Sequence, residues 1–454
     1  MDNSIIVIDD ERDFLDSVKR GLIISGISNV RVEENPKKVA DMFENGADFD
    51  IALIDITMPE MDGVELLEVI KGTNPSTECI MVTAVDEART AVNCLKKGAY
   101  DYLVKPISRE DLVTSVIRAL ERKRLVDILD LSKSKAVPKL KHKEAFKPIV
   151  TRSANVLRVL KEAELHAVSD IPILITGETG TGKELLARAI HTASARSRFL
   201  FTPVNMESLN ANLFSAEFFG HTKGSFTGAE KDRVGYLEST NLGTLFLDEI
   251  GNLPAELQGK LLRVLQDGEY IKLGTSKPRK VDIRFIAATN SDLDKMIAKK
   301  LFRRDLYYRL RGGWLHLPPL RERPDDMPLL IGRFLEEFTG PESDFKIEET
   351  AMQMLLRYDY PGNIRELRTI IQSAVNLAQG GPISPNSLPE HIRTPVTRLA
   401  QRSDPDPIMP LAEVEKGHIL RVYDRMGKNK SQTARVLGIG LNTLRRKLES
   451  YGID

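Results

Sequence analysis

Apolar and amphipathic stretches alternate over residues 1–122. Runs that are apolar throughout and bounded by polar residues predict buried strands, and a period near 3.6 predicts helices between them. We expect strands at residues 4–9, 51–54, 79–83 and 101–104. Strands that alternate with helices are typical of a parallel sheet covered on both faces, so this part is predicted to be a doubly wound α/β domain.

A second α/β pattern begins near Ile149. We expect its strands at residues 171–176, 199–204, 243–248 and 282–288. From about Pro318 the strand patterns end, and helical patterns dominate to about residue 393. Residues 411–454 are predicted to form helices only.

Two linkers separate these parts. The helix that begins near Ser108 is expected to run to about Leu131, either as a packing helix that extends beyond its domain or as a partner helix for a second chain. Residues 123–148, which end in a lysine-rich stretch with two prolines, are predicted to be a partly helical linker. The proline-rich residues 394–410 are expected to form a stiff one. The chain is therefore predicted to be multidomain, with domains at 1–122, 149–393 and 411–454.

Composition limits the class of protein. The two cysteines, Cys79 and Cys94, argue against a disulfide scaffold or a cysteine-rich metal site and favour the reducing cytosol. No apolar run approaches the ~18 residues needed to cross a bilayer, and the N-terminus lacks the basic start of a signal peptide. We therefore expect a cytoplasmic protein with no membrane partner.

Charge is unevenly distributed, although the chain is neutral overall. Residues 1–122 carry 24 Asp and Glu against 14 Lys and Arg, whereas residues 411–454 carry 9 Lys and Arg against 5 Asp and Glu. A basic C-terminal end is a weak indication of nucleic-acid binding, and a solvated charged face explains it equally well.

Polar side chains are predicted at the carboxyl ends of strands in the first domain. These ends gather at one edge of a parallel sheet, which brings Asp9, Asp10 and Asp55 together. Three facing carboxylates need a cation, and Mg²⁺ suits oxygen ligands. Asp55 is then available to accept a phosphoryl group, and Thr83 and Lys105 to bind its oxygens. Each acid alone is more often a helix cap or a surface charge. The proline that follows Lys105 makes a cis peptide bond possible at that position.

These motifs resemble a response-regulator receiver domain over residues 1–122. The matching stretches are Val7–Glu11, Leu53–Gly63, Met81–Ala84 and Gly98–Pro106. The resemblance implies that a sensor histidine kinase phosphorylates Asp55. It also implies that Thr83 and Tyr102 rearrange when Asp55 is phosphorylated. Together with Lys105, these residues would form the conformational switch of the receiver domain.

A phosphate-binding loop is predicted between an apolar strand and a helix in the second domain. Its residues are Gly177, Glu178, Thr179, Gly180, Thr181, Gly182 and Lys183. The glycines let backbone N–H groups face the phosphates of ATP, and the lysine reaches the outer phosphates. The next residue is Glu184, so the hydroxyl that usually contacts Mg²⁺ is missing there.

Strand ends further along supply candidates for hydrolysis. Asp248 and Glu249 end an apolar strand, where Asp248 would support Mg²⁺ and Glu249 would orient or deprotonate the attacking water. Asn290 ends another strand and can hold the water or the γ-phosphate. Arg303 and Arg309 lie on a predicted helix, where they form salt bridges or reach the γ-phosphate of a neighbouring subunit. In the helical part, Arg365 could sense the nucleotide.

The second domain resembles an AAA+ ATPase of the sigma-54 activator family, the NtrC type, over residues 149–393 with a helical lid from about 318. Two stretches narrow the match: residues 317–324 and the loop Gly224, Ser225, Phe226, Thr227, Gly228 and Ala229, which the family usually writes GAFTGA. The resemblance implies that the loop contacts sigma-54, that Arg303 and Arg309 are arginine fingers, and that Arg365 is a lid sensor. It also implies that Asn205 holds Glu249 inactive until the loop moves. Ser225 and Tyr360 depart from the usual Ala and Trp.

Three short helices are predicted in the C-terminal domain, at 412–426, 430–438 and 441–448. Ala434, Leu437, Leu444 and Leu448 can form a small core between the last two. The side chains predicted to point outward, toward bases and phosphates, are Asn442, Thr443, Arg445, Arg446 and Lys447. The segment resembles a Fis-type helix-turn-helix, which implies DNA binding as a dimer; a three-helix protein-binding module is the alternative.

Taken together, the resemblances imply a phosphorylation-controlled transcriptional activator bound to double-stranded DNA upstream of promoters. Dimers would assemble into a homo-hexamer, or heptamer, that hydrolyses ATP with Mg²⁺ and remodels the sigma-54 RNA polymerase holoenzyme. Two alternatives stay open: an AAA+ remodeller or helicase with another target, and a receiver-controlled repressor whose ATPase is vestigial.

Overall fold

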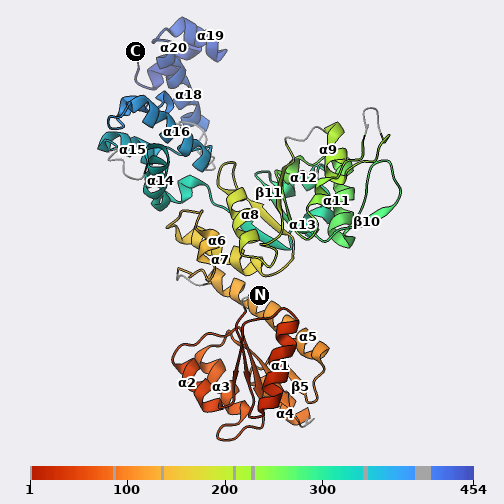
Figure 1. Ribbon diagram of the computed structural model, residues 1–454. Coiled ribbons are helices and arrows are strands. Elements are labelled where there is room, and N and C mark those ends of the chain that lie inside the picture. The colour runs from red at the N-terminus through yellow and green to blue at the C-terminus, as the bar shows by residue number, and fades with distance from the viewer. Residues whose placement is uncertain are drawn as a thin grey trace. The chain divides into compact units, whose positions relative to one another are not determined.

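The computed structural model describes residues 3–84, 88–133, 137–207, 211–225, 231–340, 346–393 and 411–453. It divides into two compact units, Met1–Arg393 and Thr394–Asp454. The first unit holds both α/β domains and the helices that follow them (Figure 1). None of the described helices combines the length and apolar composition needed to cross a bilayer.

The first domain is built on a five-stranded parallel sheet of order β2-β1-β3-β4-β5. Its strands are β1 (Ile5–Ile8), β2 (Val30–Glu33), β3 (Ile51–Asp55), β4 (Glu78–Thr83) and β5 (Asp101–Val104). The sequence did not predict β2. This strand lies at the sheet edge and only Val30 in it is buried, so it lacks the continuous apolar run of the central strands.

Helices cover both faces of this sheet (Figure 1). They are α1 (Arg12–Ile24) and α5 (Arg109–Lys133) on one face, and α2 (Pro36–Glu44), α3 (Gly63–Thr73) and α4 (Ala88–Lys96) on the other. Alternate strand residues serve opposite faces: Ile5 and Val7 pack toward α1 and α5, and Ile6 and Ile8 toward α2 and α3. The predicted doubly wound domain is thus confirmed.

The long helix expected after Ser108 is α5, which has 25 residues. Its first part packs on the sheet through Leu112, Val116 and Ala119. Further along, Leu125 and Leu129 are 54% and 59% exposed. An apolar stripe therefore extends beyond the receiver core.

The second domain holds another five-stranded parallel sheet, of order β12-β6-β11-β8-β7. Its strands are β6 (Ile173–Thr176), β7 (Phe201–Asn205), β8 (Thr244–Asp248), β11 (Arg284–Thr289) and β12 (Gly313–His316). A separate antiparallel hairpin consists of β9 (Glu269–Ile271) and β10 (Pro278–Lys280). The sequence missed β12 and the hairpin, because these strands are short and partly exposed.

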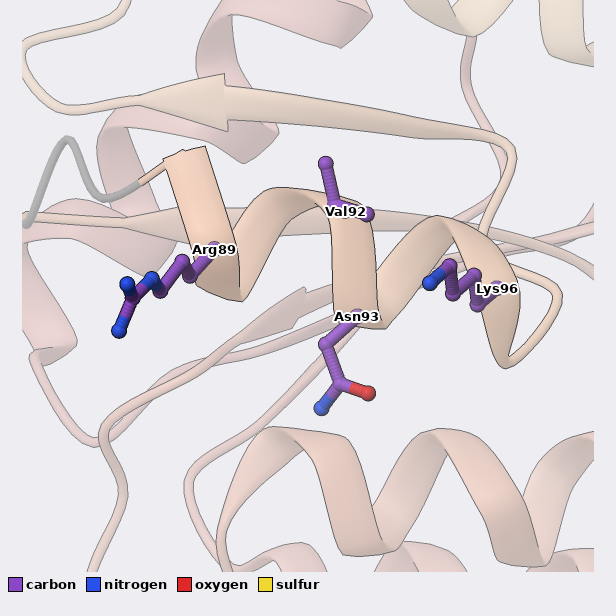
Figure 2. A pocket seen from close by; sticks show the side chains of 4 residues that line it. All are labelled: Arg89, Val92, Asn93 and Lys96. Carbon is purple, nitrogen blue, oxygen red and sulfur yellow. The ribbon is translucent and has the colours of Figure 1, made fainter.

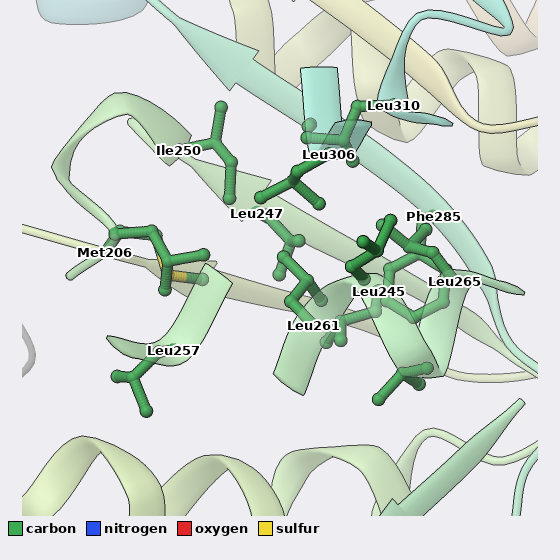
Figure 3. Close-up of a cluster of buried hydrophobic side chains, with 14 of the residues drawn as sticks. Met206, Leu245, Leu247, Ile250, Leu257, Leu261, Leu265, Phe285, Leu306 and Leu310 are labelled. Carbon is green, nitrogen blue, oxygen red and sulfur yellow. The ribbon is translucent and has the colours of Figure 1, made fainter. Parts of the chain in front are cut away.

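Two helical layers enclose the second sheet. One face is covered by α7 (Ala154–Ala167) and α8 (Lys183–Thr192), and the other by α9 (Ala211–Phe219), α11 (Ala255–Asp267) and α13 (Arg304–Leu310). Figure 3 shows strand residues such as Leu245, Leu247 and Phe285 among Leu261 and Leu306 from the covering helices. This core holds the carboxyl ends of the strands in a fixed geometry.

A helical lid follows the second sheet. It consists of α14 (Met327–Thr339), α15 (Glu349–Arg357), α16 (Asn363–Ala378) and α17 (Glu390–Arg393). Tyr360, which stands where the family usually has Trp, is fully buried, and its hydroxyl donates a hydrogen bond to the Leu355 carbonyl at 2.8 Å. The tyrosine therefore fills the lid core and satisfies its own polar group.

Residues 411–453 of the C-terminal unit form a bundle of three helices. They are α18 (Leu411–Arg425), α19 (Lys430–Leu437) and α20 (Leu441–Ser450). Gly438, with φ of 67°, ends α19 in the left-handed conformation that glycine adopts without strain. The predicted core is confirmed: Ala434, Leu444 and Leu448 are buried, and Leu437 packs against them.

Candidate functional site

Three carboxylates meet at the carboxyl edge of the receiver sheet. One oxygen from each of Asp9, Asp10 and Asp55 lies within 4.8 Å of the others. Asp9 and Asp55 are buried, and Asp10 is exposed. An all-oxygen set that is open on one side suits Mg²⁺, which keeps several waters when bound to protein carboxylates.

Lys105 balances this negative charge. Its Nζ lies 2.7 Å from Oδ2 of Asp9 and 3.4 Å from Oδ1 of Asp55, and it sits 4.2 Å above the ring of Phe14. The peptide bond after Lys105 is cis, as the sequence left open. Burial, opposed by Lys105 and reinforced by Asp9, raises the pKa of Asp55 to about 6. Phe14 was not predicted, because nothing in the helical pattern around it marks a contact with a strand end.

The backbone around Asp55 is closely packed. A Cβ added to Gly63 would lie 2.0 Å from the Asp55 carbonyl oxygen, so only glycine fits there. Thr83 is buried at the end of the adjacent strand, and its carbonyl accepts a hydrogen bond from Lys105 N at 2.7 Å. Tyr102 packs against the buried cluster beneath α3. The sheet therefore brings Thr83 and Lys105 to the edge that carries Asp55.

A shallow hollow lies on α4 of the same domain. Figure 2 shows its lining of Arg89, Val92, Asn93 and Lys96, all from this one helix. The hollow shares no residue with the carboxylate site, and its lining contains no acid or nucleophile.

The loop between β6 and α8 surrounds Lys183. Gly182 adopts a φ of 103° just before the helix begins. The buried Lys183 ammonium donates hydrogen bonds to the carbonyls of Gly177 and Glu178, at 3.0 and 3.3 Å, and lies 3.5 Å from Oε1 of Glu249. Its charge therefore faces both the loop interior and the end of β8.

Asp248 and Glu249 stand beside this loop. Burial, followed by the charge of Glu249, raises the pKa of Asp248. Oε2 of Glu249 accepts a hydrogen bond from Asn290 N at 3.0 Å, and Asn290 Nδ2 donates to Thr179 Oγ1 at 2.9 Å. Asn205 pairs in register with Asp248 across neighbouring strands, and its Oδ1 accepts from Glu207 N at 2.8 Å. The oxygens of Asp248 and Glu249 fit a hydrated Mg²⁺.

Glu184 does not replace the missing hydroxyl. It is exposed in the first turn of α8, and Oε1 accepts hydrogen bonds from Arg188 at 3.0 and 2.8 Å. This is an ordinary ion pair one helical turn apart.

The two candidate fingers, Arg303 at the N-cap of α13 and Arg309 within this helix, have different surroundings. Arg303 is exposed and forms a two-point ion pair with Asp305 at 3.0 and 2.7 Å. Arg309 donates two hydrogen bonds of 3.1 Å to the carbonyl of Leu265, within its own chain. In the lid, Arg365 is exposed, and an added Cβ at Gly180 would lie 3.1 Å from the Arg365 Cβ. Both candidate fingers are exposed, and each guanidinium is paired within its own chain.

Backbone hydrogen bonds close the segments on either side of the candidate sigma-54 loop. His221 and Arg233 exchange backbone hydrogen bonds of 3.1 and 2.9 Å, and Thr222 N donates to the Leu273 carbonyl at 3.0 Å. Gly224, with φ of 79°, and Ser225 continue the loop, and a Cβ added to Gly274 would meet Ser225 at 2.7 Å. The remaining predicted loop residues, Phe226, Thr227, Gly228 and Ala229, lie outside the described residues.

Helix α20 presents the candidate DNA contacts. Its exposed residues include Asn442, Thr443, Arg445 and Arg446. Lys447 differs from the prediction: it is half-buried, and its ammonium pairs with Glu415 of α18 at 2.7 Å. That carboxylate hydrogen bond raises the pKa of Lys447 and directs its charge toward the bundle.

Family models match four successive segments of the chain. They are the response regulator receiver domain at residues 5–117, the sigma-54 interaction domain at 149–316, the AAA+ ATPase lid domain at 321–404, and the bacterial regulatory protein, Fis family, at 410–451. The order of these segments is that of the three resemblances drawn from the motifs.

Similarity to known proteins extends over the whole chain. Regulatory protein AtoC of Escherichia coli (strain K12) is 39% identical over 462 residues, covering 100% of this chain and 98% of that protein. DNA-binding transcriptional regulator NtrC of Rhizobium meliloti (strain 1021) is 34% identical, covering 99% and 98%. The chain belongs to the NtrC-type sigma-54-dependent response regulators. AAA+ domains of these NtrC-type regulators bind ATP and are ATPases in general.

A solved structure agrees with this NtrC-type assignment. NtrX from Brucella abortus, in complex with ADP, is 31% identical and covers 100% of each chain, with a TM-score of 0.51. The same protein in complex with ATP gives a TM-score of 0.50. The predicted architecture of receiver, AAA+ domain with lid, and helix-turn-helix is confirmed.

Replacing Asp55 with Asn should stabilise the receiver domain in the absence of Mg²⁺. Burial among acids gives Asp55 a pKa of about 6 against an ordinary 3.8, so its ionised form at pH 7 opposes folding. The free-energy cost of ionising Asp55 is complete at pH values above its pKa in the folded protein. It vanishes at pH values below its pKa in the unfolded chain. Allowing for solvent screening at the open side of the cluster, where Asp10 is exposed, we expect Asp55→Asn to raise the free energy of unfolding by about 1–2 kcal/mol at pH 7.

The measurement is hydrogen exchange of the β3 amides in the full-length chain. Asp16→Asn, an exposed substitution on α1, is the matched control and should change little. Millimolar Mg²⁺ should stabilise the wild type more than Asp55→Asn and so reduce the difference. An Asp55→Asn receiver that is less protected than the wild type without Mg²⁺ would contradict this account of the cluster.

Proposed function

We propose that this response regulator hydrolyses ATP at the β6–α8 loop and uses the energy to remodel the sigma-54 RNA polymerase holoenzyme. The observation that carries the proposal is the cluster of Lys183, Glu249 and Asn290 around the phosphate loop. The first turn of α8 and the carboxyl ends of β8 and β11 supply these groups from three separate segments, which is the arrangement that phosphoryl transfer needs.

Control of the activity begins at Asp55. A sensor histidine kinase supplies the phosphoryl group, and the Asp55 carboxylate is the acceptor. Mg²⁺, when bound by Asp9, Asp10 and Asp55, neutralises the charge that develops on the transferred group. Lys105 pairs with the added oxygens, while Thr83 and Tyr102 respond on the adjacent strands. The altered receiver surface then changes how copies of the chain pair and releases a block on ring assembly.

Each side chain of the ATP site has a distinct part in hydrolysis. Lys183 holds the outer phosphates, and Asp248 supports Mg²⁺, which when bound neutralises charge on the phosphate oxygens. Glu249 orients the attacking water and accepts its proton, while Asn290 holds the water or the γ-phosphate. Arg365 approaches the nucleotide from the lid. Asn205 restrains Glu249 until the sigma-54 loop moves.

Assembly completes the site. Arg303 is exposed in the single chain, so we assign it to the ATP of a neighbouring copy, with Arg309 beside it. Dimers join into a homo-hexamer or heptamer, and the loop from Gly224 to Ala229 acts on sigma-54. The exposed face of α20 holds the ring near promoters by contacting double-stranded DNA.

Glu249→Gln should bind ATP normally and hydrolyse it at least ~10²-fold more slowly, because the water loses its general base. Lys183→Ala should instead weaken binding. ATP affinity and turnover, measured separately on the full-length protein, distinguish the two effects. Glu256→Gln, exposed in the first turn of α11, is the control. Normal turnover by Glu249→Gln would show that another group activates the water.

Arg303→Ala and Glu249→Gln should each be inactive alone and regain activity when mixed. In an equal random mixture about a quarter of the interfaces combine an intact Arg303 with an intact Glu249. ATPase activity is measured against mixing ratio and total protein concentration. Arg304→Ala, the exposed neighbour, should stay active. No recovery on mixing would indicate that each chain hydrolyses ATP by itself.

Thr227→Ala should keep ATP hydrolysis, ring assembly and DNA binding but lose sigma-54 capture and promoter opening. The reason is that the loop carries a hydroxyl and an aromatic ring with no acid or base beside them in the sequence, which suits binding rather than catalysis. Capture of sigma-54 with a transition-state analogue of ATP is the measurement. Ser276→Ala, on the neighbouring β9–β10 loop, is the control. Normal capture by Thr227→Ala would remove the loop from the mechanism.

A further inference from the structure

The lid holds the outer side of the phosphate loop through its backbone. Three successive carbonyls of the loop accept hydrogen bonds from lid groups. The pairs are Thr179 O with Asn363 Nδ2 at 3.0 Å, Gly180 O with Ile364 N at 3.0 Å, and Thr181 O with an Arg323 guanidinium nitrogen at 3.1 Å. Contact is so close that a Cβ on Gly180 would lie 2.2 Å from the Gly362 carbonyl oxygen.

This arrangement orients the peptide groups of the loop. In a planar trans peptide, the carbonyl of one residue and the N–H of the next point in opposite directions. Because the lid binds the carbonyls of Thr179 and Thr181, the N–H groups of Gly180 and Gly182 point away from it. N–H groups on that side are what a phosphate-binding loop requires. Lid contact therefore helps to set the geometry of the anion cradle.

Glu178 reinforces the same junction with a charge. Its two carboxylate oxygens accept hydrogen bonds from Arg321 at 2.6 and 2.8 Å, a two-point ion pair, and Asn363 Nδ2 adds a third at 3.1 Å. Arg321 lowers the pKa of Glu178, which keeps the carboxylate ionised at neutral pH. Both oxygens of Glu178 are thus committed to the lid.

Asn363 is built for this position. It is buried, and its backbone adopts a φ of 53°, in the left-handed region that Asn tolerates better than most residues. Its Oδ1 accepts from Leu320 N at 2.7 Å, while its Nδ2 reaches the phosphate loop. The side chain therefore joins both lid segments to the loop.

We propose that Glu178 is a positioning residue that fastens the phosphate loop to the lid through Arg321 and Asn363, so that lid engagement sets nucleotide affinity. This inference rests on the proposed ATP site. It gives Glu178 a role opposite to that of a phosphate ligand, since a carboxylate facing phosphates would repel them. By linkage, a nucleotide that tightens the loop must also favour the engaged lid, to the same extent.

The direction in which Glu178→Gln changes nucleotide affinity distinguishes a positioning role from a direct effect of charge on the phosphates. If Glu178 only placed negative charge near the phosphates, Glu178→Gln would tighten nucleotide binding. As a fastener, its loss should weaken the affinity for fluorescent ADP about 10-fold, within the usual range of coupling between sites. Arg321→Gln should weaken ADP binding to a similar degree. The double variant should lose no more than either single change, because both remove the same interaction.

Arg368→Gln is the matched control. Arg368 and Glu337 form a comparable two-point ion pair, with side chains 49% and 41% exposed against 41% and 42% for Arg321 and Glu178, but that pair joins two lid helices. It should leave ADP affinity unchanged. Hydrogen exchange of the β6 amides checks that each variant is folded. If Glu178→Gln is not folded, Arg321→Gln alone tests the proposal.

The closing experiment measures ADP affinity and ATP turnover in the full-length protein and all four variants. We expect KM for ATP to rise with ADP Kd in the Glu178 and Arg321 variants, and both losses to be non-additive. Unchanged or tighter ADP binding by Glu178→Gln, or additive losses in the double variant, would overturn the proposal. Because ADP binding needs no hydrolysis, an inactive wild type would refute the proposed ATPase and leave this test readable.

Discussion

Both α/β domains depend on the balance of charge where parallel strands end. In the first, the sheet brings Asp9, Asp10 and Asp55 from two strand ends to one edge, and in the second Asp248 and Glu249 lie at the end of a single strand. In both, a lysine from another segment faces the acids. Lys105 lies against Asp9 and Asp55, and Lys183 lies near Glu249. Buried acids crowded in this way cost free energy unless a cation is near. Each edge is therefore prepared to bind further cations or to exchange phosphoryl groups, which is the chemistry that receiver and AAA+ domains carry out.

The phosphate loop connects this chemistry to the rest of the second domain. On the sheet side, the side-chain amide of Asn290 donates a hydrogen bond to Thr179 of the loop. The backbone N–H of Asn290 donates another to Glu249. From the lid side it is held by Asn363, Ile364 and Arg323. The loop is therefore in direct contact with both the strand ends and the lid. The base of the candidate sigma-54 loop is tied to the β9–β10 segment through Thr222 and Leu273, which gives that loop a firm base on the same domain.

Sequence patterns predicted the interior of this protein better than its edges. The central strands of both sheets are continuously apolar, so their positions and the acids that follow them could be predicted. The edge strands β2 and β12 were missed because exposed or partly exposed residues interrupt the apolar run in each. The cluster around Asp55 followed from the geometry of parallel sheets alone.

Contacts between distant segments could not be predicted. Arg321 and Asn363 meet Glu178 across 143 and 185 residues, and no local pattern marks such pairs. The same reason applies to Lys447, which was expected to point outward but pairs with Glu415, 32 residues away. Arg309 likewise contacts the Leu265 carbonyl of its own chain, a partner that helical periodicity does not reveal.

The central claim is that a phosphoryl group on Asp55 controls ATP-driven promoter opening. The most direct test is open-complex formation by sigma-54 polymerase on a promoter with an upstream site for this protein, with and without a small phosphodonor. We expect opening by the wild type only when ATP, Mg²⁺ and the phosphodonor are all present, and none by Asp55→Asn. Equal opening by wild type and Asp55→Asn, or opening without ATP, would contradict it.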